Sequence, residues 1–193
     1  SLKLPSSCKT LRVEALSGCS SLERVDGFEH VVTITNRMAN NALLSQDLNL
    51  ASVEGEIGFA AFASTGITSI SSLGKCTSLA NTSSAGQGVF CDCTSLKSVV
   101  IPSTLTSIGG CAFNNDTALE SVTGDLSNVE FIGNRAFSEC SALYFEDLYL
   151  PKLTTLEWNA FYNVGIKKFN APLLTGLPSG NNLPPLGKAD TLE

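Results

Sequence analysis

The chain has 193 residues and a mass of 20.3 kDa, a length that predicts one domain with a sizeable core. Apolar residues make up 43% and charged residues 16%, which excludes an intrinsically disordered chain. No run of about 18 apolar residues is present, so we expect no membrane insertion. The net charge of -6 comes without a run of Lys and Arg, so we expect no nucleic-acid partner.

The first part of the chain, residues 8–47, shows short and irregular repeat units. Residues 11–22 echo residues 67–79 as a shorter unit that lacks an Ala-Phe pair. In residues 38–43, Leu43 is expected to stand where later units carry phenylalanine. We therefore predict repeat units that stack less evenly here than in the rest of the chain.

From about residue 48 the chain becomes regular. Ile-Gly, two variable residues and Ala-Phe recur at residues 57–62, 108–113 and 132–137, with degenerate copies at 85–90 and 156–161. The terminal phenylalanines are separated by 28, 23, 24 and 24 residues: Phe62, Phe90, Phe113, Phe137 and Phe161. A fixed period of this length is the signature of a repeat architecture.

A second pattern, L-x-x-L-x-L-P, interlocks with the first. It occurs at residues 96–102, 145–151 and 166–172, and it places Leu96, Val99 and Ile101 on the buried side of a short strand. One unit thus has a strand, a turn, a second aliphatic pair, a helical turn with Ala-Phe, and a polar corner. The sequence predicts a solenoid with short parallel strands on one face and turns with short helical segments on the other.

Cysteine recurs in a Cys-x-x-Leu motif. We expect its five copies to occupy one recurring corner, where stacked side chains point the same way, which disfavours disulfides and favours buried free thiols. After Phe113, Asp116 takes this place. The motif cysteines are Cys8, Cys19, Cys76, Cys93 and Cys140.

Residues 178–193 lose the repeat pattern and are rich in Pro, Gly and Asn. We interpret residues 1–177 as one repeat domain, which the resemblance described next identifies as a leucine-rich repeat domain, and residues 178–193 as a C-terminal cap or tail. Stacked repeats need a polar end to stay soluble. Either the last unit is truncated or the native protein continues beyond Glu193.

Residues 93–102 and 105–113 resemble the BspA-like surface-antigen type of leucine-rich repeat, found in exported bacterial proteins and some protozoan surface proteins. The resemblance is dense from about residue 48 to residue 177. It implies a leucine-rich repeat solenoid, an extracellular or cell-surface location, and a host or neighbouring-cell protein or glycan as partner. A chain that starts at Ser1 rather than Met then indicates a processed protein whose targeting segment has been removed.

The side chains that catalysis needs are scarce. His30 is the single histidine, and no G-x-S-x-G motif lies near it, so we expect no catalytic triad. Zinc needs four ligands, so Cys91 and Cys93 without a nearby histidine predict no metal site. Glu146 and Asp147 adjoin, but neighbours on a strand point to opposite faces, so we interpret them as a solvated acidic edge. We predict no enzyme activity and no cofactor.

The surface that remains for function is the strand face. Exposed Tyr and Trp suit recognition of protein or carbohydrate, although the alternative is that they fill gaps between irregular repeats. The candidate ligand-binding residues are Tyr144, Glu146, Asp147, Tyr149, Trp158, Lys167 and Lys168.

Two functions follow from these observations. The first, which the resemblance implies, is a non-enzymatic, monomeric recognition or adhesion module that binds protein or glycan through the strand face. The second is a structural spacer with no ligand of its own. A repeat scaffold hosts many ligands, so the sequence names neither partner.

Overall fold

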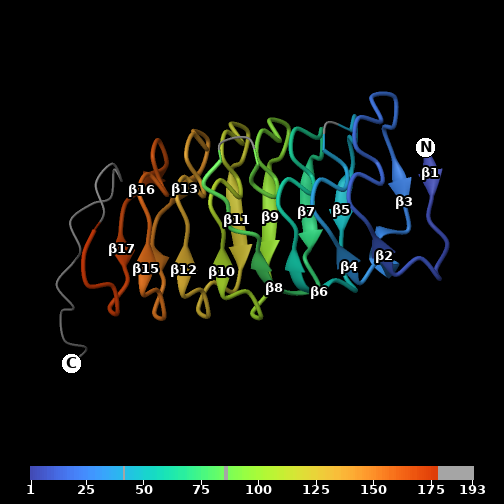
Figure 1. Cartoon of the computed structure of the whole chain (residues 1–193). Coiled ribbons are helices and arrows are strands. Elements are labelled where there is room, and N and C mark those ends of the chain that lie inside the picture. Colours follow the sequence, from blue (N-terminus) through green and yellow to red (C-terminus); the bar gives the residue numbers. More distant parts are fainter. Residues whose placement is uncertain (41, 85–86, 178–193) are drawn as a thin grey trace.

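The computed structural model describes residues 1–40, 42–84 and 87–177, and the predicted cap or tail at 178–193 lies outside this part. The chain winds into a solenoid of about seven coils, from the N-terminus at one end to the last strand at the other (Figure 1). Every paired strand is parallel to its partner. The predicted solenoid of short parallel strands is confirmed.

The strands are short and number two or three per coil. In chain order they are β1 (Leu2–Lys3), β2 (Thr10–Leu11), β3 (Val25–Asp26), β4 (Thr33–Ile34), β5 (Asp47–Asn49), β6 (Glu54–Ile57), β7 (Ser69–Ser72), β8 (Lys75–Leu79), β9 (Ser98–Ile101), β10 (Ser107–Ile108), β11 (Ser121–Gly124), β12 (Phe131–Ile132), β13 (Tyr144–Phe145), β14 (Leu148–Tyr149), β15 (Thr155–Leu156), β16 (Gly165–Ile166) and β17 (Phe169–Asn170).

Two sheets run along the solenoid. The first has the strand order β11-β9-β7-β5 and the second has the order β15-β12-β10-β8-β6. Two-stranded sheets, β1-β3 and β2-β4, continue the stack at the N-terminal end, and β13-β16 and β14-β17 continue it at the C-terminal end (Figure 1). The second sheet runs along the side of the solenoid for which the sequence predicted turns, with one aliphatic pair in each unit.

The register places equivalent residues of successive coils side by side. In the first sheet Val99 pairs with Val122, and in the second sheet Ile132 pairs with both Ile108 and Leu156. Val99 and Ile108 are fully buried, because alternate residues of each strand point inward. Each coil therefore buries its apolar side chains chiefly against the coils next to it.

A column of stacked phenylalanine rings runs through the core. Ring centroids are 5.5 Å apart for Phe62 and Phe90, 5.4 Å for Phe90 and Phe113, 5.2 Å for Phe113 and Phe137, and 5.5 Å for Phe137 and Phe161. The rings are nearly parallel, with interplanar angles of 12° or less. The phenylalanine spacing read from the sequence is therefore the coil period.

The Ala-Phe segments are turns rather than the predicted helical segments. Cys111 and Asn115, two residues before and after Phe113, have φ of 57° and 63°, a left-handed conformation that a right-handed helix does not contain. Phe113 N donates to Ala136 O of the next coil at 2.7 Å. Bonding between coils thus replaces helical bonding here, and within the described residues the helical element is the 3-10 helix η1 (Phe28–His30).

The N-terminal coils keep the same turn. Glu14 and Gly18 have positive φ around Leu16, as their equivalents have around Phe113. Ala39 N donates to Ala61 O, as Phe113 N donates to Ala136 O. Ala39 therefore occupies the position that phenylalanine has in the later coils. Leu43, which was predicted to occupy this position, is instead 51% exposed. The sequence alignment of this unit had placed the phenylalanine position four residues too far along the chain.

Candidate functional site

Six of the seven predicted ligand-binding residues lie together on the last coils. The register pairs Phe145 with Ile166 and Leu148 with Phe169, which places residues 146 and 147 beside residues 167 and 168. Lys167 Nζ forms an ion pair with Glu146 Oε1, and Tyr144 Oη donates to Glu146 Oε2 at 3.2 Å. We call this cluster the strand-face rung: Tyr144, Glu146, Asp147, Tyr149, Lys167 and Lys168.

The strand-face rung is exposed because the chain bends between β13 and β14. Glu146 lies in this bend, so Glu146 and Asp147 both face solvent instead of alternating, while Leu148 is buried. Tyr144 and Tyr149 are each 56% exposed, so neither fills a gap in the core. Desolvation and the Glu146 carboxylate raise the pKa of Tyr144, which keeps its hydroxyl protonated and able to donate.

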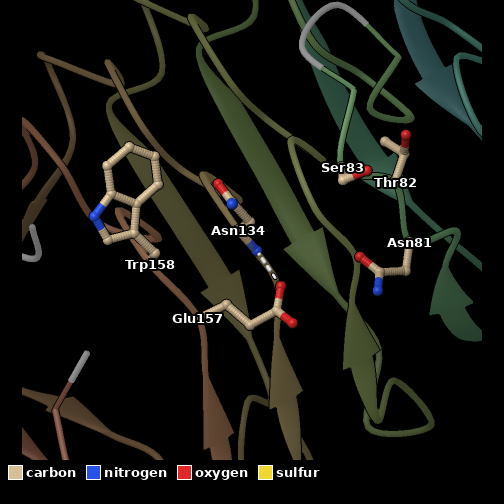
Figure 2. Close-up of a pocket in the computed structure, with 6 residues that line it drawn as sticks. All are labelled: Asn81, Thr82, Ser83, Asn134, Glu157 and Trp158. Atoms are coloured by element: carbon tan, nitrogen blue, oxygen red, sulfur yellow. Dashed lines mark hydrogen bonds between the residues drawn. The ribbon is translucent and has the colours of Figure 1, made fainter. Parts of the chain in front are cut away.

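Trp158 lies apart from the strand-face rung. It belongs to the turn after β15, where its ring packs against Arg135, with the guanidinium carbon 5.1 Å from the ring centroid. It borders a hollow of about 410 Å³, which we call the tryptophan hollow. The residues that line it are Asn81, Thr82, Ser83, Asn134, Glu157 and Trp158 (Figure 2).

An insertion builds one wall of the tryptophan hollow. Phe90 follows Leu79 by eleven positions, whereas Phe113 follows Ile108 by five. The extra residues let the chain pass Gly110 so closely that a Cβ there would lie 2.0 Å from Thr82 O. Sequence reasoning missed this site, although the 28-residue spacing was its visible signal.

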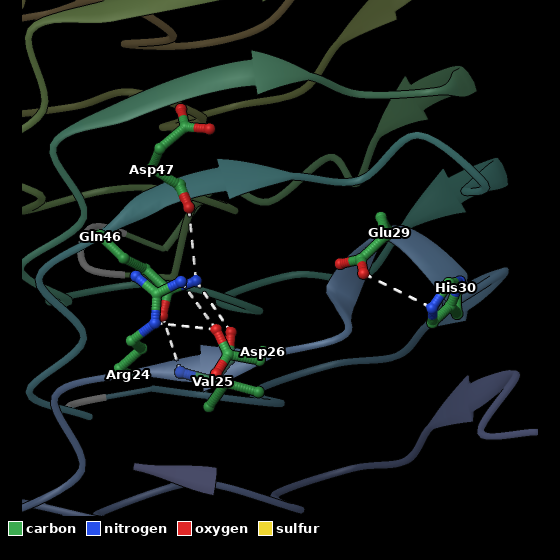
Figure 3. A network of polar contacts seen from close by, with 7 residues as sticks. All are labelled: Arg24, Val25, Asp26, Glu29, His30, Gln46 and Asp47. Carbon is green, nitrogen blue, oxygen red and sulfur yellow. Dashed lines mark hydrogen bonds and ion pairs between the residues drawn. The ribbon is translucent and has the colours of Figure 1, made fainter. Parts of the chain in front are cut away.

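A second hollow, of about 290 Å³, lies near the N-terminal end around Arg24, Asp26 and Asp47. Gln46 Oε1 accepts from Val25 N at 2.7 Å, and its Nε2 donates to Val25 O at 3.0 Å, so the side chain continues the sheet (Figure 3). Arg24 pairs with Asp26 at 2.7 Å. These polar groups are engaged with one another, which indicates a structural role.

His30 lies beside this second hollow. Its Nε2 is 3.4 Å from Glu29 Oε1, and both side chains are more than two-fifths exposed (Figure 3). In residues 1–40, 42–84 and 87–177 no group of three or more His, Cys, Asp or Glu side chains is arranged to hold a metal ion. The same residues contain no helix long and apolar enough to cross a membrane.

The Cys-x-x-Leu motif occupies two places rather than the single corner predicted. Cys19, Cys93 and Cys140 follow the phenylalanine position by three residues, whereas Cys8 and Cys76 precede buried leucines of β2 and β8. The prediction failed because a leucine follows the cysteine by three residues in both places. At the corner, the Sγ of Cys140 donates to Phe113 O at 3.0 Å.

All seven cysteines lie in the described residues and are unpaired. Burial raises the pKa of Cys76 and Cys91 from 9.0 to about 12. It also raises the pKa of Cys93, Cys111 and Cys140. These five thiols remain protonated and therefore poorly nucleophilic.

Asp116 occupies the corner after Phe113, as the sequence indicated, and it is fully buried. Its Oδ1 accepts from Cys93 N at 2.8 Å, and its Oδ2 has no hydrogen-bond partner. Burial holds the pKa of this carboxyl well above its usual value. Asp116 is thus neutral across an extended pH range and belongs to the core rather than to a surface site.

The repeat can now be compared with known proteins. Residues 1–83 and 55–178 match the BspA type leucine-rich repeat region, in six copies. The chain belongs to this family. Proteins with BspA-type repeats are typically surface-associated, and leucine-rich repeat families are generally non-enzymatic.

No curated protein matches this BspA-type chain. Among solved structures, a leucine-rich repeat protein from Bacteroides ovatus ATCC 8483 is similar, with 18% sequence identity and a TM-score of 0.37. The likeness covers 86% of this chain and 56% of that protein, so the chain spans little more than half of its length.

Proposed function

We propose that the chain is a non-enzymatic recognition module of an exported surface protein, which binds a protein or glycan through its strand-face rung. Leucine-rich repeat domains commonly mediate interactions with other proteins, and BspA-type proteins are typically surface-associated. Both properties agree with a binding role outside the cell.

The observation that carries the proposal is the exposure of Tyr144 and Tyr149 at 56% each. When a partner covers a large aromatic ring, the apolar surface of the ring is removed from water, which favours binding. The tyrosine hydroxyl can also orient the partner through a hydrogen bond. Lys167 and Lys168 stand beside Glu146 and Asp147, and Lys167 is paired with Glu146, so the charges of the rung are mixed. A partner with hydroxyl-rich or mixed polar groups fits this combination.

The test uses arrays of extracellular-matrix proteins and of glycans. The probes are the wild type, the double variant Tyr149→Ala with Lys168→Ala, and the control Tyr162→Ala with Lys152→Ala. The control removes the same residue types from exposed positions outside the rung. We expect the first variant to lose about tenfold or more in affinity, as for an interface anchor.

Both double variants should change the free energy of unfolding by no more than about 1 kcal/mol, as expected for exposed sites. Equal array binding by the wild type and the rung variant would remove the strand-face rung from the proposal. If the wild type bound nothing on either array, the proposed recognition function would be overturned and the structural spacer would be favoured.

A further inference from the structure

We propose that the tryptophan hollow is a second binding site, for a neutral pyranose sugar. It lies at the turns that follow the second sheet, apart from the strand-face rung, so it goes beyond the function proposed above. Its volume of about 410 Å³ lies within the range of small-ligand sites, roughly 300–1,000 Å³. A hollow of this size has room for one or two sugar rings.

Trp158 supplies the apolar surface that a sugar needs. Trp158 is 43% exposed, and Arg135 packs on its ring without being among the lining residues. One face of the indole is thereby fixed while another part of the ring borders the hollow (Figure 2). The negative face of an aromatic ring attracts the weakly positive C–H groups on the flat side of a pyranose.

Polar groups stand opposite the ring. Asn81, Thr82 and Ser83 lie across the hollow from Trp158, and Asn134 lies between them (Figure 2). Amides and hydroxyls both donate and accept, which suits the paired hydroxyls of a sugar. Asn81 Oδ1 accepts from Gly110 N at 2.7 Å, which fixes the side chain and leaves its two Nδ2 hydrogens to donate.

The charge of the tryptophan hollow selects a neutral ligand. Glu157 is the ionisable lining residue, and its Oε2 accepts from Asn134 N at 2.7 Å, which holds the carboxylate in the hollow. An acidic sugar would meet this carboxylate and the overall charge of -6. A sugar with equatorial hydroxyls and a flat C–H side, such as a glucopyranose, fits best.

The repeat arrangement explains why a hollow forms beside Trp158. The positions equivalent to Trp158 in the two preceding coils are Gly110 and Asn134, which are small or polar. The insertion after Ala80 closes the far side. The lining residues thus come from three of four successive coils, with Asn81, Thr82 and Ser83 in the first, Asn134 in the third, and Glu157 and Trp158 in the fourth.

Trp158 is the only tryptophan of the chain, so its fluorescence reports directly on this site. We would titrate the full chain with cellobiose and with N-acetylglucosamine, and with N-acetylneuraminic acid as the acidic comparison. We expect saturable emission changes with dissociation constants of about 1–10 mM for at least one neutral sugar, as for a shallow site. The acidic sugar should give no saturable change.

Two matched variants locate the binding. Asn134→Ala should weaken binding about three- to tenfold, because one neutral hydrogen-bonding side chain is lost. Tyr162→Ala, an exposed aromatic outside the hollow, should bind like the wild type. Saturation-transfer NMR of Trp158→Ala with the same sugars gives a readout independent of fluorescence, and its signal should disappear.

The absence of saturable binding of either neutral sugar by the wild type would overturn this proposal. Wild-type affinity in Asn134→Ala, or an unchanged NMR signal in Trp158→Ala, would overturn it equally. Neither outcome affects the strand-face rung, whose array test uses variants outside the hollow.

Discussion

At the scale of single residues, the corner after the phenylalanine shows what the coil requires. Thr65 Oγ1 donates to Phe62 O at 2.8 Å, and Cys93 Sγ donates to the same oxygen at 3.1 Å. Asp116 occupies the equivalent place but accepts a bond instead, and one of its oxygens is left without a partner. The sequence predicted where Asp116 lies, whereas the buried oxygen depends on packing that the sequence does not display.

The first prediction concerns Asp116 and pH. Its folded pKa is raised by burial, so the folded chain holds a proton that the unfolded chain releases near pH 3.9. The stabilisation is complete below about pH 4 and decreases by about 1.4 kcal/mol per pH unit as pH rises towards the folded pKa. Asp116→Asn should therefore raise the free energy of unfolding at pH 7 by about 1 kcal/mol or more.

Urea denaturation of wild type and Asp116→Asn from pH 4 to pH 8 measures this effect. The difference between the two proteins should grow with pH, because other carboxylates titrate equally in both. Asp125→Asn, a change at an exposed carboxylate, is the control and should not show this trend. A constant difference across the pH range would contradict a raised pKa for Asp116.

At the scale of elements, the phenylalanine column and the strands of the L-x-x-L-x-L-P pattern were predictable, because both repeat with the coil period. The left-handed residues around each phenylalanine were not, since Cys111, Arg135 and Asn159 share no side-chain chemistry. Cys111 and Arg135 are held by backbone bonds to the next coil, which a sequence does not display. This is why the sequence predicted helical segments. The sequence also predicted a single position for the Cys-x-x-Leu motif. The spacing of three residues does not distinguish the corner after the phenylalanine from the position before the leucine of β2 or β8.

The second prediction concerns this column. Phe113 lies between Phe90 at 5.4 Å and Phe137 at 5.2 Å and is fully buried. Phe113→Ala should reduce the free energy of unfolding by about 3–5 kcal/mol, because transfer energy and packing are both lost. Chemical denaturation measures the loss.

Phe131→Ala is the matched control. Phe131 is half-buried in β12 and lies outside the stacked column, so its removal should cost clearly less. Equal losses for both variants, or an unchanged midpoint for Phe113→Ala, would contradict the role given to the column.

At the scale of the whole molecule, function is placed on surfaces that the stack leaves free. The strand-face rung was predictable from the sequence, because parallel register brings equivalent residues of successive coils together. The tryptophan hollow was not, since its walls come from Asn81 and Trp158, which lie three coils apart. Its depth depends on an insertion in one coil opposite a large residue in another.

The central claim is that residues one period apart are interchangeable in the stack, so that every surface assignment follows from one register. Removal of residues 114–137, a full coil of 24 residues, joins Phe113 to Ser138 and keeps that register. Stacked repeats lose stability when a unit is removed but remain folded, because each unit contacts its neighbours. Removal of residues 114–125, half of this coil, breaks the register.

Far-UV circular dichroism with urea denaturation of both deletion variants tests this claim most directly. The full-coil deletion should retain the β-sheet spectrum and unfold cooperatively at a lower urea concentration than the wild type, and the half-coil deletion should be unfolded. An unfolded full-coil deletion, or equal folding of the two variants, would contradict the register.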